Sequence, residues 1–84
     1  MSEPFTQLRS LAQNENPNIR SISKRAIKYR DALQSGSINL REYNDLMLEL
    51  QRTNIVAKTA DDLKFKQMLS SCLQAAINIG STLI

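Results

Sequence analysis

Apolar residues recur at spacings of three and four along most of this chain, which is the pattern of amphipathic helices. The clearest stripe contains Ile19, Ile22, Ala26, Tyr29 and Leu33. A chain of 84 residues can build only one modest core. We therefore expect an all-α fold with a single helical domain over 1–84. The expected architecture is a small bundle of three to four helices at approximately 3–13, 17–35, 40–54 and 60–79.

A helix stop followed at once by a helix start defines a helical hairpin at Gly36–Asn39. Glycine readily adopts the left-handed conformation that closes a helix. Asn39 and Glu42 have the spacing of a capping box, in which each side chain bonds the backbone N–H of the other residue. Ile38 and Tyr43 flank this box at the spacing of a hydrophobic staple.

Other boundaries follow from proline and from capping residues. Asn16 precedes Pro17 and suits the N-cap of the second helix, and Ser2 suits that of the first. Residues 53–56 are poor helix formers, and Thr59 with Asp62 has the spacing of another capping box, so we favour a break near 54–59. One long helix also remains possible, because neither glycine nor proline occurs between positions 39 and 79.

The expected fourth helix has a broader apolar surface than one small core requires. Its main stripe is widened on both sides, and the residues involved are Phe65, Met68, Leu69, Cys72, Leu73, Ala75, Ala76, Ile77 and Ile79. One interpretation is a central helix packed on all sides. The other is a candidate apolar partner face, comprising Leu69, Leu73 and Ile77, that docks a protein partner or a second copy.

Positive charge is concentrated on the second helix, although the net charge of the chain is only +3. Arg20, Lys24 and Lys28 lie opposite its apolar stripe with Arg25 on their flank, and Asp31 is its only acid. This surface is either a solvated helix face or a binding face for nucleic-acid phosphates or an acidic protein. The helix after the hairpin is a poor DNA reader, because phosphates would repel the acids Glu42, Asp45 and Glu49.

The residue types needed for most enzyme chemistry are missing or scattered. There is no histidine and only one cysteine, Cys72, which sits in an apolar pattern typical of a packing thiol. Acids occur in the group 42–49 and at 61–62, but we expect Arg41 and Arg52 to pair with Asp45 and Glu49. The sequence therefore predicts no enzyme, no catalytic, cofactor or metal site, and no small-molecule substrate.

The segment 67–84 carries no charged side chain, yet seven polar residues interrupt it, so we do not expect it to span a membrane. The first residues also lack the basic and apolar regions of a secretory signal. We therefore expect a cytoplasmic protein with no membrane partner.

The run Gly36-Ser37-Ile38-Asn39-Leu40-Arg41-Glu42-Tyr43, continued by Leu46, resembles short helical oligomerisation modules and small helical proteins of tailed bacteriophages. The lysine that usually follows the aromatic residue is absent, since Asn44 stands there. The phage resemblance implies an accessory role, such as binding a host or replication protein in the host cytoplasm. We thus expect a non-enzymatic protein-interaction or oligomerisation module, with nucleic-acid association through the second helix as the alternative.

Overall fold

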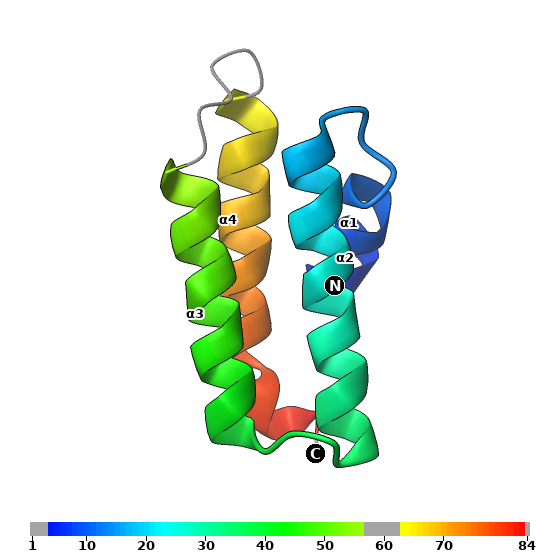
Figure 1. Cartoon of the computed structure of the whole chain (residues 1–84), viewed down its shortest axis with the longest axis vertical. Helices are drawn as coiled ribbons and strands as arrows, with labels where there is room; N and C mark the ends of the chain where they lie inside the picture. The colour runs from blue at the N-terminus through cyan, green and yellow to red at the C-terminus, as the bar shows by residue number, and fades with distance from the viewer. Residues whose placement is uncertain (1–3, 57–62, 84) are drawn as a thin grey trace.

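The computed structural model describes residues 4–56 and 63–83, which form four helices and a terminal 3₁₀ turn. The α-helices are α1 (Pro4–Leu11), α2 (Pro17–Ser35), α3 (Leu40–Val56) and α4 (Leu63–Asn78), followed by the 3₁₀ helix η2 (Gly80–Thr82). Successive helices run in opposite directions, and the short α1 covers only one half of the bundle (Figure 1). The predicted all-α bundle is confirmed.

The ends of α2 are set by the residues that the sequence indicated. The Asn16 side chain accepts hydrogen bonds from the backbone N–H groups of Asn18 at 2.9 Å and Ile19 at 3.5 Å, and Pro17 opens the helix. At the other end Gly36 has a φ of 82°. Its N–H donates to the Leu33 carbonyl, while the N–H of the next residue reaches back to Ala32, which is the Schellman arrangement.

The capping box at the start of α3 is also confirmed. The N–H of Glu42 donates to Asn39 Oδ1 at 2.8 Å, and the N–H of Asn39 donates to Glu42 Oε1 at 3.2 Å. Ile38, just before the box, is half-buried and packs against the core that contains Tyr43. The hairpin therefore positions Tyr43 one turn into α3, facing the interior.

Several helix boundaries differ from those expected. Helix α1 ends at Leu11 because the N–H groups of Gln13 and Asn14 bond carbonyls three residues back, which tightens the chain into a turn. Helix α3 continues to Val56 and α4 begins at Leu63, and the two pack side by side as separate helices (Figure 1). The predicted caps at Ser2 and at Thr59 with Asp62 lie outside the described residues.

One core joins all four helices. Helix α1 packs on α2 and α4, α3 also packs on α2 and α4, and α2 contacts α4 across the bundle. The fully or nearly buried apolar residues are Phe5, Leu8, Leu11, Ile19, Ile22, Ala26, Leu33, Tyr43, Met47, Leu50, Leu69, Cys72, Leu73 and Ala76. Helix α4 thus has neighbours on three sides, which explains its wide apolar surface.

The buried Tyr43 joins the start of α3 to the end of α4. Its hydroxyl donates to the backbone carbonyl of Ala76 at 2.8 Å, one of the last four carbonyls of α4, which have few partners within a helix. Its ring lies against Gly80, where an added Cβ would come within 2.9 Å of the Tyr43 Cε2 atom. Leu40 is half-buried because η2 folds back against α3.

A second polar contact joins the opposite ends of the same two helices. Asn54 is only 2% exposed, and its Nδ2 donates to the backbone carbonyl of Lys66 at 2.9 Å. Between these two contacts, Gln51 Nε2 donates to Gln74 Oε1 at 3.3 Å. These bonds require a definite lengthwise alignment of α3 against α4, which apolar packing alone specifies less tightly.

Replacing Tyr43 with phenylalanine should lower the free energy of unfolding by about 1–2 kcal/mol, because the buried Ala76 carbonyl loses its donor. Urea denaturation followed by circular dichroism measures the change. Tyr29→Phe is the matched control, since Tyr29 is only half-buried and no hydrogen bond of its hydroxyl is found among the described residues. Equal losses in the two variants would contradict the role assigned to the Tyr43 hydroxyl.

Stability should also fall at high pH through Tyr43. Burial raises the pKa of Tyr43 to about 12 from an ordinary value of 10.0, and the nearby Arg30 charge offsets part of this rise. The folded state therefore favours the neutral phenol, so this contribution is complete below pH 10 and is lost as the pH rises towards 12. Urea titrations across this range should show a steeper decline for the natural chain than for Tyr43→Phe. Parallel declines would contradict the assignment.

Candidate functional site

The exposed side of α2 presents four cations. Arg20, Lys24, Arg25 and Lys28 are all exposed, whereas the opposite side of the helix is buried. Three of them follow one another every four residues, which places their backbone positions roughly 6 Å apart along the helix axis. We call these four residues the basic face.

A fifth cation of α2 neutralises the only acid of that helix. Arg30 donates from Nε at 3.2 Å and from Nη2 at 3.0 Å to the same oxygen of Asp31. The guanidinium also lies over the Phe5 ring of α1, 4.8 Å from its centroid, so Arg30 is held against the bundle. This is the one ion pair found within residues 4–56 and 63–83. The charges of the basic face are therefore not offset by ion pairs with described residues.

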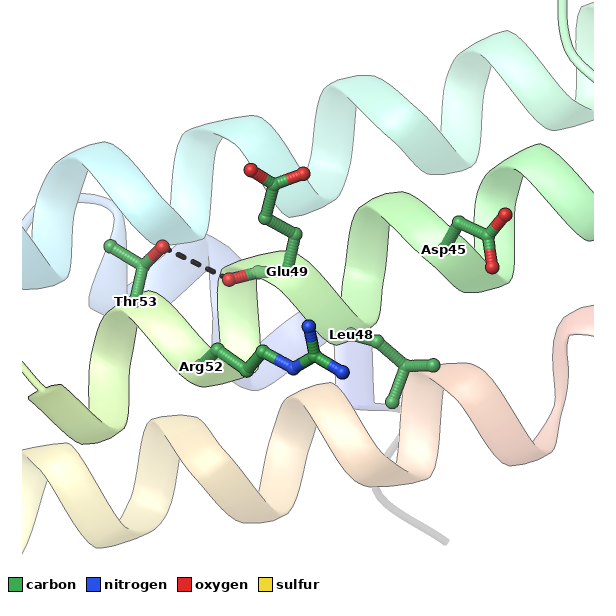
Figure 2. A pocket seen from close by; sticks show the side chains of 5 residues that line it. All are labelled: Asp45, Leu48, Glu49, Arg52 and Thr53. Carbon is green, nitrogen blue, oxygen red and sulfur yellow. Dashed lines mark hydrogen bonds between the residues drawn. The ribbon is translucent and has the colours of Figure 1, made fainter.

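The outer side of α3 carries a shallow hollow lined by Asp45, Leu48, Glu49, Arg52 and Thr53. In Figure 2, Glu49 points to one side of α3, while Arg52 and Leu48 point to the other. Thr53 bonds back to the Glu49 carbonyl at 2.9 Å. Because one helix supplies the whole lining, the hollow is open to water and lacks the enclosure typical of small-molecule sites.

Two expectations about α3 have different outcomes. The ion pairs expected between Arg41 or Arg52 and the acids Asp45 and Glu49 are not formed among the described residues. These four side chains are exposed, and the entropy of holding long side chains together offsets most of the gain from such a pair. The expected acidic outer side of α3 is present, because Glu42, Asp45 and Glu49 are all exposed.

The candidate apolar partner face on α4 is not available on the surface of this chain. Leu69 and Leu73 are both 0% exposed, and Ile77 is half-buried against the core. The reason is that α1, α2 and α3 cover α4 from three sides. Phe65 and Met68, expected in the buried stripe and its flank, are instead 36% and 37% exposed.

The single cysteine of the chain belongs to the core of the bundle. Cys72 is buried, and its Sγ donates to Gln7 Oε1 at 2.9 Å, which ties α4 to α1. Burial raises the pKa of the Cys72 thiol, so the nucleophilic thiolate is disfavoured. Nowhere in the described part of the chain do three potential metal-ligating side chains gather. Asp61 and Asp62 fall outside that part.

The helical spacing correctly predicted that the four cations of the basic face are exposed together on α2. It missed the pairing of Arg30 with Asp31. Neighbouring residues on a helix do not normally face each other, so spacing offered no signal for this contact. The guanidinium reaches Asp31 from a position fixed by the Phe5 ring of another helix.

Among the described helices, none has the length and apolar character needed to cross a membrane. Comparison with known proteins finds no matching family model, no similar curated protein and no similar solved structure.

Proposed function

We propose that this chain is a non-enzymatic binding module that holds a nucleic-acid backbone on the basic face of α2. The observation that carries the proposal is the set of four exposed cations, whose helix has its single acid paired by Arg30. A row of cations on a convex helix can neutralise successive phosphates and release their counterions. Such contacts position a protein without reading base sequence.

The lack of an apolar anchor on α2 favours nucleic acid over an acidic protein as a tightly bound partner. Stable protein interfaces usually depend on a few large apolar or aromatic side chains that become buried. The large exposed apolar residues among those described are Leu48, Phe65 and Met68, and none belongs to α2. Affinity from released counterions does not need such an anchor.

The charges on α3 argue against sequence reading by the helix that follows the hairpin. In helix-turn-helix proteins that helix enters the major groove, between two rows of phosphates. Here its exposed side carries Glu42, Asp45 and Glu49. We therefore propose backbone binding by α2 without base recognition, which would suit the accessory role that the phage resemblance implies.

The double variant Lys24→Glu/Lys28→Glu tests this function. Fluorescence anisotropy with a labelled duplex at low salt should show a loss of affinity of at least about tenfold. For the natural chain, the logarithm of the binding constant should fall with the logarithm of salt concentration at a slope of roughly −3 to −4, as expected for about four neutralised phosphates.

Arg52→Glu/Lys64→Glu is the matched control, because it makes the same total charge change at exposed positions on α3 and α4. This control should keep most of the affinity. An equal loss in both variants, or binding that does not respond to salt, would contradict a role for the basic face.

A further inference from the structure

Four exposed charges on α2 and four on α3 follow the same pattern at nearly the same spacing, but with opposite signs. Along the outer side of α2 the order is Arg20, Lys24, Lys28 and Asp31, that is, three positive charges and then one negative charge. Along the outer side of α3 the exposed Arg41 comes first, and from there the order is Glu42, Asp45, Glu49 and Arg52, that is, three negative charges and then one positive charge. The steps are four, four and three residues on α2, and three, four and three on α3.

All eight side chains are on the outside of the bundle. At about 100° per residue, each set of four falls within roughly 80° of its helix circumference, opposite the buried stripe. All eight residues are exposed, and Asp31, although paired with Arg30, keeps 62% of its side-chain surface exposed. Each helix therefore presents one row of charge, here called the α2 row and the α3 row.

The two rows do not neutralise each other within one copy. Helices α2 and α3 are neighbours that run in opposite directions (Figure 1), and the eight residues of the two rows are all exposed. Apart from the Arg30–Asp31 pair, no ion pair is found in the described ranges. The complementary charges are thus available to another molecule.

We propose that a second copy of this chain docks its α3 row, in parallel, on the α2 row of the first. Parallel alignment sets Arg20 opposite the partner's Glu42. It likewise sets Lys24 opposite the partner's Asp45 and Lys28 opposite the partner's Glu49. The last rung has reversed sign, with Asp31 opposite the partner's Arg52. The rungs are about 4.5–6 Å apart along both helices, and over about three turns the two rows differ in length by only about 1.5 Å, so the rungs stay in register.

The charge order also selects the direction of docking. Antiparallel docking in the same register would place Asp31 opposite a glutamate and Arg20 opposite an arginine, so two of the four rungs would be repulsive.

A contact between two different surfaces leaves one row free on each outer copy, which allows further copies to add. Exposed ion pairs are weak and screened by salt, so this association belongs to low ionic strength and high protein concentration.

A charge-swap experiment tests the proposal. One variant reverses the α2 row with Lys24→Glu/Lys28→Glu, and the other reverses the α3 row with Asp45→Lys/Glu49→Lys. In each variant alone, two of the four rungs pair like charges. In a mixture, the reversed α2 row of one variant meets the reversed α3 row of the other, so all four rungs are attractive. The two unchanged rows make the natural contact. Sedimentation velocity at low salt and rising protein concentration measures the weight-average mass.

The natural chain should exceed its monomer mass of 9.5 kDa, each variant alone should stay at that mass, and the mixture should again exceed it. Added salt should return the natural chain and the mixture to monomer. A natural chain that stays monomeric, a variant that associates alone as the natural chain does, or a mixture that stays monomeric would overturn the proposal. Circular dichroism of each variant establishes that these exposed changes leave the fold intact.

Self-association through the two rows is independent of nucleic-acid binding. The experiment contains no nucleic acid, and the variant with Asp45→Lys/Glu49→Lys keeps the whole basic face. That variant should lose self-association and still bind a duplex, so the two proposals can fail separately.

Discussion

The buried Tyr43 is the contact on which the arrangement of the other elements depends. It joins three segments, because it belongs to the first turns of α3, its hydroxyl reaches the end of α4 at Ala76, and its ring lies on Gly80 at the start of η2. The capping box of Asn39 and Glu42 fixes the direction in which α3 leaves the hairpin. The hairpin thereby places Tyr43 against the end of the last helix.

The position of α4 in turn decides which surfaces are free for function. Because α4 lies among the other three helices, its wide apolar surface forms the core and Leu69 and Leu73 are not exposed. The outer faces of α2 and α3 are the surfaces on which charge accumulates. A basic helix and an acidic helix lie side by side, with one ion pair among the described residues, so the molecule has two exposed surfaces of opposite charge.

The parts of the fold that sequence predicted are those set by local interactions. Asn16 with Pro17, Gly36, and Asn39 with Glu42 act within a few residues of themselves, so spacing alone identifies them. The contacts that set the packing join distant residues, as Tyr43 does with Ala76 and Cys72 with Gln7. Periodicity shows how wide an apolar face is, but it does not show what covers that face, which is why the sequence left open whether α4 is a central packed helix or carries a partner face. The basic face was predictable because exposed charges opposite a core stripe need no partner.

The most direct test of the central role of Tyr43 is the stability of the Gly80→Ala variant. Gly80 does not have a positive φ, so alanine is an allowed residue there and, by restricting the unfolded chain, would ordinarily stabilise the protein by about 0.4–1 kcal/mol. If the Tyr43 ring occupies the space beside Gly80, the added methyl group must displace it, and the free energy of unfolding should instead fall by about 1–3 kcal/mol. An unchanged or increased free energy of unfolding would show that Tyr43 and η2 are not tightly packed, and would contradict this account of the fold.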